Sequence, residues 1–202
     1  MKGARRPAGA SAAVSTRTAE VVPYDPGWPR RFEATAAALR AALGVNVLAV
    51  HHIGSTAVPG LAAKPILDVL PVVADLGAVD RAEAAMAAAG FSARGENGLA
   101  GRRYFVRATG GRRTDHVHVY ADGDAAIARH LAVRDFLRAH PDEAARYGAL
   151  KTALASTDES SERYAAAKEP FVADLKRRAL AWAALTGRPG TVECVDAESP
   201  RP

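Results

Sequence analysis

The chain has 202 residues, of which 49% are hydrophobic and 24% charged, a composition typical of one globular domain with a sizeable core. Lys and Arg outnumber Asp and Glu by 27 to 22, but no basic run is interleaved with aromatic residues, so specific nucleic-acid binding is not indicated. One cysteine, Cys194, excludes an internal disulfide and a multi-cysteine metal site. No segment has the apolar length of a signal peptide or a membrane span, which predicts a soluble, cytoplasmic protein that does not contact a membrane.

Both ends of the chain lack hydrophobic periodicity. Residues 1–19 are rich in Ala, Ser, Arg and Gly, and residues 187–202 are rich in turn-forming residues. We therefore expect two flexible tails around a single domain that covers residues 20–186.

The domain begins with a helix, followed by two strands. Apolar residues recur every three or four positions from Phe32 to Leu43, and Gly44 ends the pattern. Residues 45–53 and 65–73 are β-branched and mostly apolar, as buried strands are, and Gly54, Pro59 and Gly60 break the chain between them. An Ala-rich helix over residues 76–89 follows.

The second half combines a hairpin with helices. Residues 102–107 and 114–120 flank a Gly-rich turn, which predicts two antiparallel strands. Three helices follow, over residues 124–139, from Pro141 onward, and over 161–185, where Pro170 predicts a kink or an interruption. The expected fold class is α+β, with a mixed or antiparallel sheet flanked by helices.

The segment HIGSTAVPGLAAKPILD has a layout that phosphate chemistry uses. Gly54 lets a backbone approach a ligand closely, the hydroxyls of Ser55 and Thr56 can donate to phosphate oxygens, and Asp68 on the next strand can hold a metal ion. DNA polymerase beta-like nucleotidyltransferases place an acidic pair about a dozen residues after a Gly-Ser turn. Twelve residues separate Ser55 from Asp68 here, but Leu70 replaces the second acid. Alone, the pattern also fits a tight turn followed by a buried, capped aspartate.

A family resemblance adds to this pattern. The string HIGSTAVPGLAAKPILDVL resembles the signature of the GrpB family, and YDPGWPRRFE, TDHVHVY, RDFLRAHP and YAAAKEPFV resemble other parts of that family in the same order, over roughly residues 21–183. The resemblance implies a nucleotidyltransferase-like fold in which one set of residues lies at the nucleotide end. These residues are Gly54, Ser55, Thr56, Lys64 and Asp68. GrpB domains also occur fused to dephospho-coenzyme A kinase, which associates the family with nucleotide metabolism.

Histidines could complete a metal site. His116 and His118 are two apart on one expected strand, so they share a face, and together with His52 and Asp68 they could converge on one divalent ion. Such mixed ligation suits Mn²⁺, Zn²⁺ or Fe²⁺ better than Mg²⁺. The alternative is that the histidines pair with Asp115 or with backbone groups.

The C-terminal helices offer cations for a triphosphate. Tyr164 and Lys168 lie four apart on one helical face, and Arg134, Lys151 and Lys64 could join them in a phosphate clamp. Taken one at a time, these side chains also fit solvated surface charges.

The sequence therefore predicts a metal-dependent nucleotidyltransferase that binds ATP or another nucleoside triphosphate and transfers a nucleotidyl group to a small molecule or protein. Asp68, Ser55 and Lys64 are the expected catalytic residues, and the metal is Mg²⁺ or Mn²⁺, with Zn²⁺ or Fe²⁺ as alternatives. Two other readings stay open. One is a non-catalytic ligand-binding module on the same fold, suggested by Leu70, and the other is a His/Asp metal enzyme that uses no nucleotide.

Overall fold

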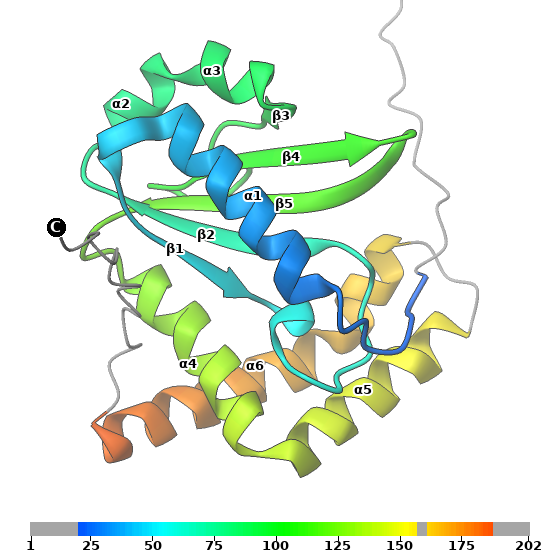
Figure 1. Ribbon diagram of the computed structural model, residues 1–202. Coiled ribbons are helices and arrows are strands. Elements are labelled where there is room, and N and C mark those ends of the chain that lie inside the picture. The colour runs from blue at the N-terminus through cyan, green and yellow to red at the C-terminus, as the bar shows by residue number, and fades with distance from the viewer. Residues whose placement is uncertain (1–19, 157–160, 188–202) are drawn as a thin grey trace, which may run out of the picture.

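A computed structural model describes residues 20–156 and 161–187 (Figure 1). The tails expected over residues 1–19 and 187–202 lie outside the described residues, except for Gly187, and so does Cys194. Within the described ranges, no helix combines the length and the apolarity needed to cross a membrane.

The centre of the fold is a five-stranded sheet with the spatial order β1-β2-β5-β4-β3. The strand bounds are β1 Val47–Ile53, β2 Leu67–Val73, β3 Phe91–Ala93, β4 Arg103–Thr109 and β5 Arg112–Ala121. β2 and β5 are parallel, and the other neighbouring strands are antiparallel. The sheet is mixed, which confirms the α+β fold class.

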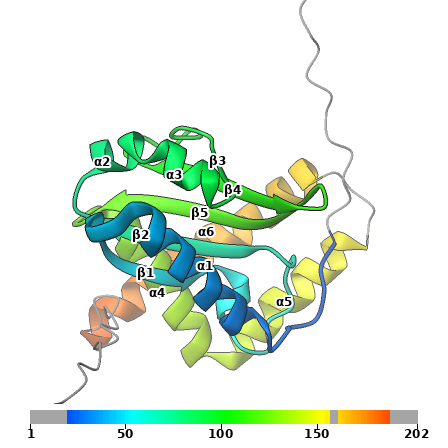
Figure 2. The same cartoon turned by 45° about the horizontal axis from the view of Figure 1, so that its top comes forward.

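Helices cover the two faces of the sheet. Their bounds are α1 Trp28–Leu43, α2 Leu76–Arg81, α3 Glu83–Ala88, α4 Ala125–Ala139, α5 Pro141–Ala155 and α6 Ser161–Thr186. α1 crosses one face with α2 and α3 beside it, while α4, α5 and α6 gather on the other side (Figures 1 and 2).

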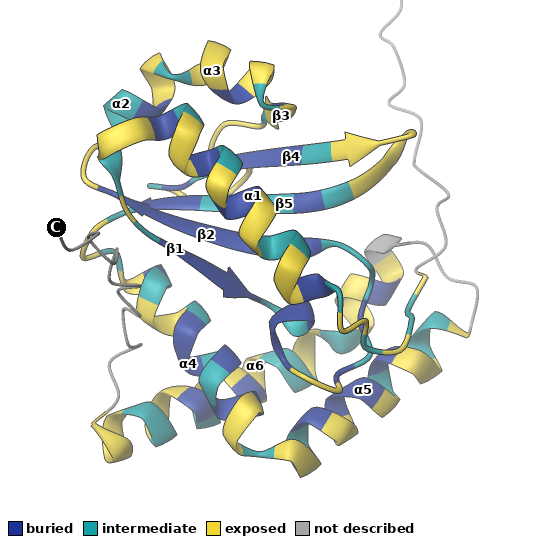
Figure 3. Ribbon diagram, in the orientation of Figure 1, coloured by how far each residue is buried: buried dark blue, intermediate teal, exposed yellow. Residues whose placement is uncertain are grey.

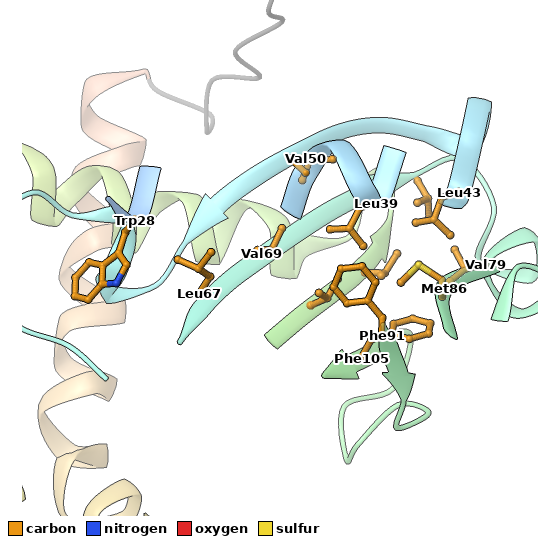
Figure 4. Close-up of a cluster of buried hydrophobic side chains, with 14 of the residues drawn as sticks. Trp28, Leu39, Leu43, Val50, Leu67, Val69, Val79, Met86, Phe91 and Phe105 are labelled. Atoms are coloured by element: carbon orange, nitrogen blue, oxygen red, sulfur yellow. The ribbon is translucent and has the colours of Figure 1, made fainter. Parts of the chain in front are cut away.

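The main core lies under α1. Leu39 and Leu43 of α1 and Met86 of α3 pack against Val69 of β2 and Phe105 of β4 (Figure 4). Alternate strand residues supply this face, because successive side chains of a strand point to opposite sides of the sheet. We call it the α1 face.

A second apolar layer lies on the opposite face, which we call the α4 face. Ile53, Leu70 and Tyr120 pack there against Leu131 of α4. β2 is buried along almost its whole length, whereas buried and exposed residues alternate along the helices, as the colours of Figure 3 show.

The strand register decides which polar residues can meet. Asp68 is paired with Ile53 of β1 and with His116 of β5, so its side chain shares the α4 face with both. His118 is paired with Tyr104 of β4 on that same face. The polar residues of three strands therefore meet on one side of the sheet.

The structure departs from the sequence prediction in three places. The helix expected over residues 76–89 is divided at Ala82 into α2 and α3. β3 is an additional short strand that antiparallel pairing with β4 holds in the sheet. α6 continues through Pro170, so the interruption expected there does not occur.

Candidate functional site

The loop after β1 lies directly against the carboxylate of β2. Gly54 has a φ of +69°, and a Cβ atom added to it would lie 3.0 Å from both Cβ and Cγ of Asp68 and closer still to its Oδ2 atom. Only glycine fits this approach, since it has no Cβ and adopts positive φ without strain. The glycine turn and the aspartate expected from the sequence therefore do face each other.

Two histidines hold Asp68 from the neighbouring strand. His116 Nδ1 and His118 Nε2 each lie 3.4 Å from Asp68 Oδ1. Burial raises the pKa of Asp68, but hydrogen bonds with His116 and His118 oppose burial, and the net pKa is well below its usual value. The Asp68 side chain stays 33% exposed, so a ligand can reach this ionised carboxylate.

Arg102 fixes the proton on His118. Its Nη1 atom lies 3.3 Å from His118 Nδ1. A guanidinium can only donate, so Nδ1 accepts and His118 carries its proton on Nε2, facing Asp68. Arg102 also donates to the carbonyls of Glu96 and Asn97, which anchors the loop before β4 at this site.

His130 of α4 lies beside the same group. Its ring centroid is 5.6 Å from that of His118 and 6.1 Å from that of Tyr120, and burial lowers its pKa to about 4. Arg102 and His130 were both missing from the sequence prediction. His130 follows the buried Ala126 by one helical turn, which was the available signal, whereas no pattern distinguished Arg102 from its neighbours.

His52 and Thr56 lie on the wrong side of the sheet for the roles expected of them. His52 stacks on Phe32 of α1 with ring centroids 4.8 Å apart, and its Nε2 atom is 2.9 Å from the hydroxyl of Thr56, which is 1% exposed. The predicted convergence of His52 with Asp68, His116 and His118 is therefore wrong. Asp68 is paired with Ile53, so the side chain of the preceding residue, His52, lies on the opposite face of the sheet. Burial, with Arg138 nearby, lowers the pKa of His52 to about 4.

The histidines do not pair with Asp115, which was the alternative expectation. Asp115 lies on the α1 face, where it accepts hydrogen bonds from Arg107 Nε at 2.8 Å and from the Thr35 hydroxyl at 2.9 Å. These buried polar groups satisfy one another, and His116 and His118 are left to contact Asp68.

The donor set does not fit a site for two metal ions. Leu70, at the position of the second acid, is fully buried among apolar side chains. Over residues 20–156 and 161–187, no group of three or more His, Cys, Asp or Glu side chains is placed to hold a metal ion. Two metal ions need several carboxylates, and Asp68 alone supplies one.

Two of the expected lysines share an aromatic platform. Lys64 Nζ lies 4.4 Å from the centroid of the Tyr164 ring, and Lys168 Nζ lies 5.3 Å from the same centroid. Burial raises the pKa of Tyr164 to about 12, so the ring is neutral and attracts cations through its π face. The structure thus brings Lys64, Tyr164 and Lys168 together, as expected.

The third lysine lies on α5 next to the same loop. Lys151 is buried, donates a hydrogen bond to the carbonyl of Ala62, and places Nζ 4.4 Å from the centroid of the Tyr147 ring. Tyr147 in turn hydrogen-bonds with Ser55. Burial, reinforced by the charge of Lys168, lowers the pKa of Lys151 to about 7, while the charge of Asp68 opposes this shift.

Arg134 has a different role from the phosphate clamp expected of it. Its guanidinium is buried, donates to both carboxylate oxygens of Asp135, and reaches the backbone carbonyl of His52 at 3.3 Å. These bonds tie α4 to β1. Arg134 therefore supports the strand before Gly54 rather than facing a ligand.

Two hollows of the surface lie away from Asp68. One of about 410 Å³ is lined by Val58, Pro59 and residues of the α4–α5 corner, and another of about 300 Å³ lies between Val79 and Tyr104. Asp68 lines neither of them. The polar group around Asp68 is thus a partly buried site that lies outside these two hollows.

The family comparison agrees with the resemblance noted in the sequence. A family model described as GrpB protein matches residues 18–178. The chain belongs to the GrpB family. A crystal structure of the conserved protein GrpB from Enterococcus faecalis has 41% sequence identity and a TM-score of 0.78, and covers 82% of this chain and 99% of that one.

Curated relatives of this GrpB-family chain include longer proteins. The UPF0157 protein YqkA of Bacillus subtilis is 39% identical over 185 residues, which is 91% of this chain and 54% of that protein. A dephospho-CoA kinase of Mycolicibacterium paratuberculosis is 35% identical over 193 residues, which is 83% of this chain and 47% of that protein. The chain therefore spans about half the length of these two relatives.

Proposed function

We propose that this GrpB-family domain binds a nucleoside triphosphate beside Asp68 and transfers its nucleotidyl group to an acceptor hydroxyl. The observation that carries the proposal is the approach of Gly54 to the ionised, partly exposed carboxylate of Asp68. This approach places the backbone of the Gly54 loop beside the carboxylate, so a ligand on the exposed side of Asp68 would meet both. The relative named dephospho-CoA kinase, of which this chain covers 47%, associates GrpB domains with nucleotide metabolism and so supports the choice of a nucleotide ligand.

In this proposal the phosphate chain runs from Asp68 toward the lysines. The Ser55 hydroxyl and the backbone at Gly54 donate to the α-phosphate. Lys64 and Lys168 bind the β- and γ-phosphates, the buried Lys151 adds its charge to theirs, and the three lysines so stabilise the leaving pyrophosphate. The charge of Asp68 influences both Lys151 and Lys168, which shows that they lie within electrostatic reach of this carboxylate.

Asp68 orients the acceptor. The Asp68 carboxylate accepts a hydrogen bond from the hydroxyl group of the acceptor substrate. The oxygen of this hydroxyl group forms a new bond to the α-phosphorus, and the bond from the α-phosphorus to the bridging oxygen breaks. Pyrophosphate leaves, and the hydroxyl proton passes to Asp68 and then to solvent. A weakly basic carboxylate serves here because phosphoryl transfer depends mainly on positioning and charge stabilisation. His116 and His118 keep the carboxylate in place.

A second candidate function is a binding module without turnover. Leu70 favours it, because this buried leucine fills the position of the second acid. Such a module would bind the nucleotide and release no pyrophosphate.

Calorimetric titration with the four ribonucleoside triphosphates, followed by a pyrophosphate-release assay with amine, alcohol and protein acceptors, tests the proposal. Asp68→Asn keeps the shape of the side chain and should remove pyrophosphate release. Asp122→Asn, at an exposed residue next to Gly123, is the control and should leave release unchanged. Tight binding without release by the unaltered protein would favour the module, and no binding of any triphosphate would refute both candidates.

A further inference from the structure

We propose that Lys64, Lys151 and Lys168 form a binding site for a polyphosphate chain that needs no divalent metal ion. We call these three side chains the lysine cluster. The binding of a nucleoside triphosphate at this cluster rests on the proposed function. The new element is that lysine ammonium groups, in place of a metal ion, neutralise the phosphate charge.

The first argument is the poor supply of metal ligands. Asp68 Oδ1 already has His116 and His118 as neighbours, its Oδ2 faces Gly54, and Leu70 contributes no oxygen. The part of the chain that the structure describes places no group of three or more His, Cys, Asp or Glu side chains where they could hold a metal ion. Here one carboxylate that two imidazoles already contact would have to hold the ion.

The second argument is that one loop connects the lysine cluster to the turn at Gly54. Ser55 hydrogen-bonds with Tyr147, over which Lys151 Nζ lies, and Ala62 accepts a hydrogen bond from that same Nζ atom. Two residues later, Lys64 lies over Tyr164 together with Lys168. Contacts with the loop between Gly54 and Asp68, or with the Tyr164 ring that a side chain of that loop also contacts, therefore connect the three lysines.

The third argument is the burial and mutual repulsion of the three lysines. Burial lowers the pKa of Lys64, Lys151 and Lys168, and the charge of Lys168 lowers the pKa of both other lysines further. The charges of Asp68 and Glu169 raise the pKa of Lys168, but burial outweighs them. Partly desolvated ammonium groups that repel one another gain most from a polyanion, because its charge relieves the repulsion and the desolvation together.

The test is a titration of the full chain with inorganic triphosphate and with ATP, each in excess EDTA and in millimolar Mg²⁺ or Mn²⁺. We expect the Kd of inorganic triphosphate in EDTA to lie within about threefold of its value with metal. Lys151→Met and Lys168→Met should each weaken binding in EDTA by about ten- to a hundredfold, the range of a hydrogen bond to a charged group. Lys176→Met, at an exposed lysine paired with Glu169 at 3.7 Å, is the matched control and should change Kd less than threefold.

The outcomes separate the two proposals. Binding of inorganic triphosphate in EDTA without binding of ATP would keep the lysine cluster and refute the proposed nucleotide function. Binding of both ligands only with metal would overturn the metal-independent site and leave the nucleotide function standing. The metal-independent site would also be overturned by an unchanged Kd in both lysine variants, or by no binding of inorganic triphosphate in EDTA. Lys168 is partly exposed, so its variant remains informative if Lys151→Met fails to fold.

Discussion

The contact between Gly54 and Asp68 makes Gly54→Ala the most informative single substitution. The new methyl group would occupy space that the Asp68 side chain fills, with Cβ and Cγ of Asp68 only 3.0 Å away. The alanine would also have to adopt the positive φ of +69° found at residue 54. Two separate costs therefore act at one position.

Gly60→Ala separates these costs. Gly60 has a similar φ of +78°, and an added Cβ there meets nothing within 4 Å. The left-handed backbone alone costs about 1 to 2 kcal/mol, which we expect for Gly60→Ala. Overpacking adds about 1 to 3 kcal/mol, so Gly54→Ala should lower the free energy of unfolding by about 2 to 5 kcal/mol.

Urea denaturation of both variants measures the difference, with the slope m used to check that unfolding stays two-state. Combining Gly54→Ala with Asp68→Ala should cost less than the sum of the two single changes, because the carboxylate that obstructs the methyl group is gone. Equal destabilisation by Gly54→Ala and Gly60→Ala, or simple additivity in the double variant, would refute the close approach on which the site is built.

Three further predictions concern the sheet. Leu70→Asp supplies the missing acid but buries a charge among apolar groups. It should therefore lower the free energy of unfolding by about 3 to 5 kcal/mol without adding a metal site. Stoichiometric Mn²⁺ binding by a stable variant would contradict this prediction. His52→Gln should leave the Kd for triphosphate within about twofold, since His52 lies on the α1 face; a loss of tenfold or more would place it in the site. The pKa of His130 is about 4 in the folded protein and 6.5 in the unfolded chain. Between these pH values the unfolded chain binds more protons. The free energy of unfolding therefore falls as the pH drops from 6.5 to 4, by at most about 3 kcal/mol. His130→Gln should flatten that part of the stability curve, and an unchanged slope between pH 6.5 and 4 would contradict the assignment.

Local signals in the sequence were sufficient for most elements of the fold. α1 ends at Gly44, whose φ is +58°, as a helix-terminating glycine requires. Gly110 and Gly111 both have positive φ and join β4 to β5 in a two-residue turn. β3 was missed because three residues carry too little periodicity, and its existence depends on pairing with β4.

The sequence predicts most residues of the site, but it does not predict the pairing register of the strands that decides which face each residue occupies. The facing of Gly54 and Asp68 follows from a turn between two neighbouring strands, and the common face of His116 and His118 follows from strand alternation. Placing His52 on the correct face required the pairing of Ile53 with Asp68, which no local pattern shows, because a slip of one residue moves a side chain to the opposite face. The contact of Arg102 with His118 depends in the same way on tertiary structure.

The central claim is that phosphates bind beside Asp68, and the imidazole resonances of the histidines test it most directly. In a spectrum of the uniformly ¹⁵N-labelled protein, a non-hydrolysable nucleoside triphosphate should shift the ring signals of His116 and His118. The signals of His140, which stacks on Phe136 at the α4–α5 corner, should stay in place. Saturating ligand that moves His140 and leaves His116 and His118 unchanged would contradict the account.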